Sequence, residues 1–233
     1  MARTRKYLIF AVGLLPSSRA KNRALNRLGY QIALTATLGP VLLMNVASMV
    51  VGAGARIGPF NVLRDLASVD MAAHARLGQW NWVSASGPLV AAGGSGSLSV
   101  GEHSAVTSRH YLDCSGGISV GRFTTVAGVR STFITHGIDW KSSRQRTRPI
   151  SIGDYCLISS NVSLAPGTVV ANQVVVGMGA TVSGRLSPEG SLNVSPRAVP
   201  VKLGLSGSYF DRSTGTVDVE ASSATELRKT VDK

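Results

Sequence analysis

The sequence is poor in acidic, aromatic and sulfur-containing residues. Of its 233 residues, 12 are Asp or Glu, 6% are aromatic and only two, Cys114 and Cys156, are cysteines. Without a CxxC spacing, these two exclude a zinc site and a thioredoxin-type redox pair, and their apolar surroundings favour buried reduced thiols. Few aromatics beside 26 glycines predict short strands and tight turns rather than a helical bundle.

The shortage of acids gives a formal net charge of +12, but two segments hold nearly all of the excess. Nine bases and no acid precede Asp65, and residues 140–149 add Lys141, Arg144, Arg146 and Arg148 without an acid. No basic helix is interleaved with aromatics, and no zinc-finger, helix-turn-helix or RNA-binding signature is present. We therefore predict no nucleic-acid partner.

The basic N-terminal segment 1–31 is partly apolar. Its run from Tyr7 to Leu15 is short and lacks a clean cleavage site, so we expect a retained segment rather than a signal peptide. The uncharged stretch 28–55 is long enough to span a bilayer, but it contains Gln31 and Pro40 and merges into a repeat, which argues against a transmembrane helix. We expect a cytoplasmic protein with peripheral contact to the anionic inner face of the membrane through this segment.

A six-residue period organises most of the chain. An aliphatic residue recurs at every sixth position, at Ile152, Ile158, Leu164, Val170, Val176 and Val182. The residue after each is small, and the residue four after each of the first five is small or β-branched. Neither a helical period nor a strand period of two produces this pattern. The register occurs earlier too, with a two-residue slip after Val69 and a continuation to Leu89.

This pattern predicts a parallel β-helix in which each hexad is one short strand plus a corner. The aliphatic residue points inward and stacks on its counterpart in the next coil, and the small residue that follows gives the corner its backbone freedom. A β-sandwich would need the same spacing to arise by chance.

The repeat resembles that of the left-handed β-helix hexapeptide-repeat acyltransferases. Their motif [LIV]-[GAED]-x-x-[STAV]-x stands here as IGPFNV, VGEHSA, VGRFTT, IGDYCL and VGMGAT, with Asn61 departing from the fourth-position rule. The resemblance covers residues 32–203 and implies a left-handed all-β coil, a homotrimer with active sites between neighbouring prisms, and acetyl-CoA as acyl donor. We expect an irregular tail over 204–233.

A long polar insertion interrupts the hexads once, as a loop over residues 136–149. Its start, Thr135-His136-Gly137, and the restart Pro149–Gly153 resemble the maltose/galactoside-type sugar O-acetyltransferases. The resemblance implies that His136 is the catalytic base, since a neutral imidazole can take the proton of a hydroxyl as it attacks a thioester. Asp139 is the candidate to hold the other ring nitrogen, and a backbone carbonyl is the alternative.

The remaining candidate residues are weaker. His110, Asp113 and Trp140 are predicted to line the acceptor pocket, whereas His74 and His103 are expected at the surface or at corners. The resemblance implies that Ser160, Met178 and Gly179 contact the pantetheine of acetyl-CoA and that Arg197 and Lys202 contact its phosphates. No HxxxxH pair is present, so the zinc site of the γ-class carbonic anhydrases, which share this fold, is not expected, nor is any other metal.

The sequence therefore predicts an acetyl-CoA-dependent O-acetyltransferase that acts on a saccharide hydroxyl, in the modification or biosynthesis of surface polysaccharide. Two alternatives stay open: an N-acyltransferase on an amino-sugar nucleotide, and a non-catalytic hexapeptide-repeat scaffold. The arginines of loop 136–149 are either solvated or form a clamp for an anionic acceptor or for CoA phosphates.

Overall fold

The structure is a computed structural model that describes residues 2–196 and, beyond them, 203–204, 206–207, 209–211 and 213. The chain divides into two units, residues 1–195 and 196–233, and only the first is described further. Arg197 and Lys202, together with most of the predicted tail, lie outside the described residues.

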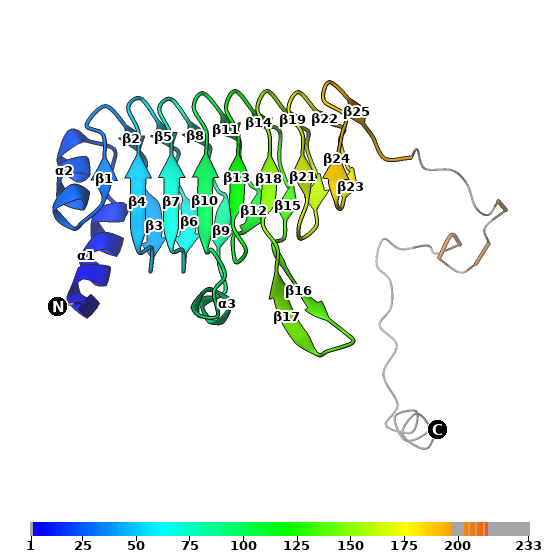
Figure 1. The fold of residues 1–233 in the computed structure, drawn as a ribbon, viewed down its shortest axis with the longest axis horizontal. Coiled ribbons are helices and arrows are strands. Elements are labelled where there is room, and N and C mark those ends of the chain that lie inside the picture. The colour runs from blue at the N-terminus through cyan, green and yellow to red at the C-terminus, as the bar shows by residue number, and fades with distance from the viewer. Residues whose placement is uncertain (1, 197–202, 205, 208, 212, 214–233) are drawn as a thin grey trace, which may run out of the picture. The chain divides into compact units, whose positions relative to one another are not determined.

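Three parallel sheets wrap around one axis and form a left-handed β-helix (Figure 1), which confirms the predicted fold class. Sheet A consists of β1 (Gln31–Ile32), β4 (Ser48–Val51), β7 (Ser68–Met71), β10 (Ser97–Val100), β13 (Ile118–Val120), β18 (Ile150–Ile152), β21 (Val169–Val170) and β24 (Arg185–Leu186). Sheet B consists of β2 (Thr37–Leu38), β5 (Arg56–Ile57), β8 (Arg76–Leu77), β11 (Ala105–Val106), β14 (Thr125–Val126), β19 (Leu157–Ile158), β22 (Val175–Val176) and β25 (Leu192–Asn193). Sheet C consists of β3 (Val41–Met44), β6 (Asn61–Arg64), β9 (Trp82–Ser84), β12 (Tyr111–Asp113), β15 (Thr132–Phe133), β20 (Ser163–Leu164) and β23 (Thr181–Val182).

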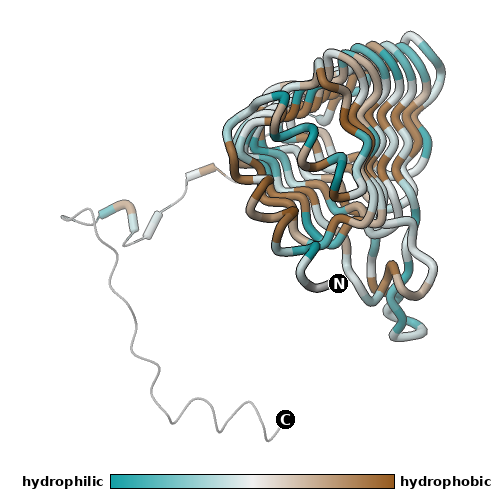
Figure 2. Tube along the Cα trace, turned by 90° about the vertical axis from the view of Figure 1, so that its left-hand side faces the viewer, coloured by the Kyte–Doolittle hydropathy of each residue, from teal (hydrophilic) through white to brown (hydrophobic). Residues whose placement is uncertain are grey.

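The hexad aliphatics form the core of this prism. The six residues of the uninterrupted run are buried, as are the small or β-branched residues at the fourth positions, which are Cys156, Val162, Thr168, Val174 and Ala180. Viewed along the prism, their columns appear as continuous hydrophobic stripes (Figure 2). The core is therefore a stack of aliphatic layers, and it needs few aromatic residues.

The two-residue slip reflects longer coils in the N-terminal half. Val51 pairs with Met71, 20 residues later, whereas Ile152 pairs with Val170, 18 residues later. The additional residues lie in four-residue strands such as β7, where Val69 is a second inward position stacked on Leu98. The slip is thus a change of strand length within one fold.

The small residue after each aliphatic has a different cause from the one that the sequence suggested. The left-handed corner residues lie two positions further on, at Tyr155, Asn161, Gly167, Gln173 and Gly179. A Cβ added at Gly153 would lie 2.8 Å from the backbone nitrogen of Asn172 in the next coil. The position is small because neighbouring coils approach closely, not because the corner needs a flexible residue.

His74 and His103 lie at corners, as predicted. Both have a positive φ, and so do Phe123 and Tyr155 in the following coils. The four rings stack in sequence with centroids 4.7–5.1 Å apart along the edge between sheets A and B. Stacking and burial of ring faces offset the cost of a left-handed conformation at bulky residues.

Two excursions, not one, leave the prism, both between sheet C and sheet A. Residues 86–96 contain the short helix α3 (Gly87–Ala91), so Leu89 is not an inward hexad residue. The predicted loop 136–149 is an antiparallel hairpin of β16 (His136–Asp139) and β17 (Arg144–Thr147). One coil separates the two, and both project from the same edge of the prism (Figure 1).

Two helices close the N-terminal end of the prism: α1 (Ala2–Gly13) and α2 (Arg19–Arg27). Lys21 of α2 is 1% exposed, and its Nζ lies 2.7–3.2 Å from four carbonyl oxygens, those of Gly13, Leu15, Leu38 and Gly39. Burial lowers the pKa of Lys21 to about 8, so the amine is still a charged donor at neutral pH. Part of the basic N-terminal charge is therefore used inside the protein.

The uncharged stretch 28–55 does not form a helix beyond Leu28, because it supplies strands β1 to β4 of the prism. Among the described residues, no helix has the length and apolar character needed to cross a membrane. Contact of the N-terminal segment with a membrane surface stays a prediction.

Replacing Lys21 with methionine should destabilise the protein by about 3 kcal/mol, because the change leaves buried carbonyl groups without a donor. Chemical denaturation at pH 7 measures the loss. Arg23→Met, on the exposed face of the same helix, is the matched control and should change stability by less than about 0.5 kcal/mol. Equal effects of the two substitutions would contradict the role given to Lys21.

Candidate active site

His136 and Asp113 form a hydrogen-bonded pair where the hairpin leaves the prism. Nδ1 of His136 lies 2.7 Å from Oδ2 of Asp113, and the side chains are 35% and 5% exposed. A carboxylate is an acceptor, so Nδ1 carries the proton and Nε2 keeps its lone pair. This is the arrangement of a histidine base that an acid orients.

The carboxylate of Asp113 is held by several donors. Oδ1 accepts from Ser115 Oγ at 2.5 Å, and Oδ2 accepts from the backbone nitrogen of Thr135 at 2.8 Å, with the Thr135 hydroxyl at 3.0 Å. Burial by itself would raise the pKa of Asp113, but hydrogen bonds from Ser115, His136 and Thr135 outweigh it and lower the pKa. Asp113 is therefore ionised at neutral pH.

The two excursions flank this pair. The backbone nitrogen of Ser86, at the start of the first, donates to Ser115 Oγ at 2.9 Å. The corner between them contains Gly116, where a Cβ would lie 2.8 Å from the carbonyl oxygen of Thr135. A glycine at this position lets the corner pack against the base of the hairpin.

A pocket of about 300 Å³ opens beside the pair on the outer face of sheet C. Aromatic, arginine and serine side chains line it together with the pair: Arg64, Trp82, Ser84, Ala85, Ser86, Tyr111, Asp113 and His136. We call it the His136 pocket. The sequence reasoning missed Arg64, Trp82 and Tyr111, because only the coil register aligns these distant residues.

Asp139 does not contact Nδ1 of His136, so the sequence-based expectation for its partner is corrected in favour of Asp113. Asp139 pairs with Arg146 at 2.9 Å across the hairpin and accepts from the backbone nitrogen of Lys141 at 3.0 Å. The hairpin register explains this, because Asp139 is three residues along β16 from His136, opposite Arg144.

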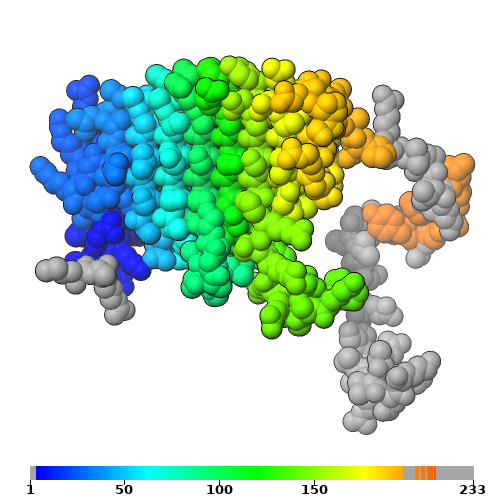
Figure 3. Space-filling view, viewed as in Figure 1, coloured from blue at the N-terminus to red at the C-terminus, as the bar shows by residue number. Residues whose placement is uncertain are grey.

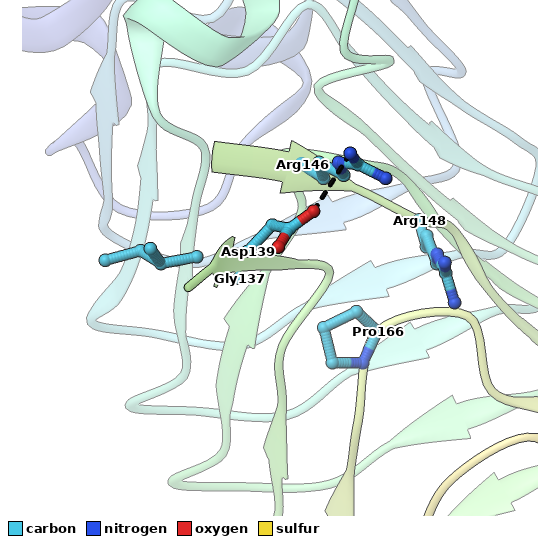
Figure 4. A pocket seen from close by; sticks show the side chains of 6 residues that line it. Gly137, Asp139, Arg146, Arg148 and Pro166 are labelled. Atoms are coloured by element: carbon cyan, nitrogen blue, oxygen red, sulfur yellow. Dashed lines mark ion pairs between the residues drawn. The ribbon is translucent and has the colours of Figure 1, made fainter. Parts of the chain in front are cut away.

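A second cavity, of about 210 Å³, borders the hairpin. Its lining comprises Gly137, Ile138, Asp139, Arg146, Arg148 and Pro166. Figure 4 shows Arg146 turned toward Asp139 and Arg148 beside Pro166. The ion pair offsets part of the cationic charge that the sequence places in this segment.

His110 does not line the acceptor pocket as the sequence suggested. It is 2% exposed and belongs to a corner column in which each side chain accepts the backbone N–H of the next coil. Asn61 accepts from Asn81, Asn81 from His110, His110 Nδ1 from Ser131, and Ser131 from Val162, at 2.9–3.2 Å. The column also explains why Asn61 departs from the small fourth residue of the motif.

The other predicted residues lie apart from His136. Trp140 is 82% exposed in the turn of the hairpin, with Lys141 over its ring. Ser160, Met178 and Gly179 lie at the corner between sheets B and C, where the nitrogen of Gly179 donates to the carbonyl of Ser160 at 3.1 Å. Sheet C thus separates them from His136. Within the described part of the chain, no group of three or more His, Cys, Asp or Glu side chains could hold a metal ion.

Comparisons with known proteins give no family assignment. No family model matches the chain, and no curated protein matches it. A solved structure of a serine-to-alanine mutant of AntD, an N-acyltransferase from Bacillus cereus in complex with dTDP-4-amino-4,6-dideoxyglucose and coenzyme A, is similar in fold, with 13% identity and a TM-score of 0.45. The alignment covers 91% of this chain and 94% of that chain. At these values the likeness transfers neither substrate nor chemistry.

The buried imidazole of His110 should make stability sensitive to acid. Burial lowers its pKa to about 4 from an ordinary value of 6.5, so the unfolded chain binds the proton more readily and stability falls as the pH drops from 6.5 toward 4. His110→Asn keeps an acceptor for Ser131, as Asn81 does for His110, and should remove about 2 kcal/mol of the loss between pH 6.5 and 5. Denaturation at both pH values measures it, and an unchanged pH dependence would contradict the assignment.

Proposed function

We propose that the protein is an acetyl-CoA-dependent O-acetyltransferase that acts on a saccharide hydroxyl, with His136 as general base. The supporting observation is the His136–Asp113 pair at the edge of an open pocket with aromatic and arginine walls. A buried ionised carboxylate on Nδ1 fixes the imidazole tautomer in which Nε2 accepts a proton. The resemblance of the hexads to acyltransferase repeats supplies the donor class.

The proposed reaction has one bond made and one broken. The acceptor hydroxyl attacks the thioester carbonyl while Nε2 of His136 removes its proton. The carbon–oxygen bond forms, the carbon–sulfur bond of the tetrahedral intermediate breaks, and the proton on Nε2 passes to the departing thiolate. Asp113 stabilises the transient imidazolium without taking up the proton.

The donor and the assembly are part of this proposal. Acetyl-CoA would approach from the corner between sheets B and C, where Ser160, Met178 and Gly179 present backbone groups and a small side chain. A homotrimer would bring this corner of one prism toward the His136 pocket of another. Action on surface polysaccharide at the inner face of the membrane would fit the basic N-terminal segment.

Replacing His136 with alanine should lower transfer from acetyl-CoA to a saccharide acceptor by roughly 10³-fold, because general-base catalysis is lost. Product formation is measured by mass spectrometry, and an unchanged melting temperature shows that the variant folds. Near-normal turnover in a folded His136→Ala variant would refute the assignment of the base.

The bond in the product separates the proposal from its alternatives. Hydroxylamine cleaves an ester under mild conditions and leaves an amide, so a hydroxylamine-labile product supports O-acetylation. A stable product with an amino-sugar nucleotide would indicate an N-acyltransferase. A chain that acetyl-CoA does not stabilise thermally would be a scaffold.

The partner of His136 can be tested with two carboxylates. Asp113→Asn should lower kcat by roughly 10³-fold, since an amide does not fix the base tautomer or stabilise the imidazolium. Asp139→Asn removes a carboxylate from the hairpin without touching Nδ1, so kcat should stay within about threefold of wild type. Steady-state kinetics on both variants, after a check of folding by circular dichroism, distinguishes them, and the opposite ranking would restore Asp139 as the partner.

A further inference from the structure

The His136 pocket has a second end that the reaction proposed above does not use. His136 and Asp113 stand at one end, and Arg64 of strand β6 stands at the other. In the register of sheet C, Arg64 pairs with Ser84 and Ser84 pairs with Asp113. Neighbouring parallel strands are about 4.8 Å apart, so the two ends are about 10 Å apart. A ligand that reaches both ends is longer than one sugar ring.

Aromatic side chains form the wall between these ends. Trp82 and Tyr111 are register partners on β9 and β12, and they are 42% and 44% exposed. The indole is held in place, because its Nε1 donates to the Ser84 hydroxyl at 3.1 Å. In the following coils the same outward column contains only hydroxyl side chains, at Thr132, Ser163 and Thr181. The aromatic wall is thus confined to the pocket, and exposed rings of this kind pack against the C–H faces of sugars.

The guanidinium of Arg64 is also held in place. Its Nε donates to Oδ2 of Asp65 at 2.9 Å, and Oδ1 of Asp65 accepts from Asn45 at 2.9 Å. A guanidinium bound through Nε still offers its two terminal nitrogens, whose geometry matches a carboxylate or a phosphate. Asp65 offsets part of the positive charge, so the attraction acts by direct contact and geometry rather than at long range.

We propose that the acceptor is an anionic saccharide. Its carboxylate or phosphate binds Arg64, a sugar ring packs on Trp82 and Tyr111, and the hydroxyl to be acylated lies at His136, about 10 Å from the anionic group. The binding part of this proposal stands on the pocket alone, and the position of the reacting hydroxyl rests on the proposed function.

Binding can be measured without the acyl donor. The probes are a disaccharide ending in glucuronic acid, its carboxyl-reduced neutral form, and the same neutral disaccharide carrying a phosphate, each titrated into the full-length protein by isothermal calorimetry. The acid or the phosphate should bind about tenfold more tightly than the neutral form. The tighter of the two identifies the anionic group.

The variants Arg64→Gln and Trp82→Ala separate the two contacts. Arg64→Gln should abolish the preference for the charged probe and leave binding of the neutral probe within about twofold, whereas Trp82→Ala should weaken all probes about tenfold. The matched controls are Arg76→Gln on sheet B and Trp80→Ala, an exposed ring stacked on Phe60 at another corner, and neither should change binding. Equal binding of charged and neutral probes to wild type, or a preference that survives Arg64→Gln, would overturn the proposal.

The same probes keep this proposal distinct from the proposed function. With acetyl-CoA added, a charged probe that binds through Arg64 but is never acylated would refute the transferase and leave the binding site standing. Acylation at a rate that Arg64→Gln and Trp82→Ala leave unchanged would refute the binding site and leave the transferase standing.

Discussion

The structure depends on the backbone hydrogen bonding that stacks each coil on the next in a fixed register. Parallel pairing brings equivalent residues of successive coils into columns about 4.8 Å apart, so one rule about side-chain size or polarity applies along the whole column. The aliphatic columns form the core, and the close approach of coils fixes the small positions such as Gly153. The space-filling view shows these layers as an unbroken body from which the excursions project (Figure 3).

The same register satisfies the buried polar groups at the corners. Asn81, His110 and Ser131 each use a side-chain acceptor to hold the backbone N–H of the next coil, so the polar column replaces hydrogen bonds that water would otherwise supply. Asp113 follows this rule as well, because its Oδ2 accepts from the backbone of Thr135. His136 is the next residue in the chain and therefore arrives at a carboxylate that the fold has already oriented. The geometry of the pair is a consequence of coil stacking, which is why it is preorganised.

The excursions turn this corner into a pocket. The prism itself has flat outer faces, and a flat face does not enclose a ligand. The α3 excursion and the hairpin leave the same edge one coil apart, and the corner with Asp113 lies between them. Sheet C supplies the remaining wall with Trp82 and Tyr111, and Arg64 lies further back along the prism. Chemistry and ligand contacts thus come from four successive coils that the register places side by side.

The sequence by itself determined the repeat, its inward positions and the start of the hairpin at His136, because a period of six over unbroken turns leaves a signal that needs no tertiary information. It did not determine the partner of His136. Asp139 is close in sequence but points across the hairpin to Arg146, whereas Asp113 is 23 residues earlier and one coil below. The α3 excursion, the buried role of His110 and the pocket residues were missed for a related reason. Contacts between coils depend on coil length, and the lengths change at β7 and at both excursions. Only the tertiary structure gives the resulting register, and with it the residues that meet at the site.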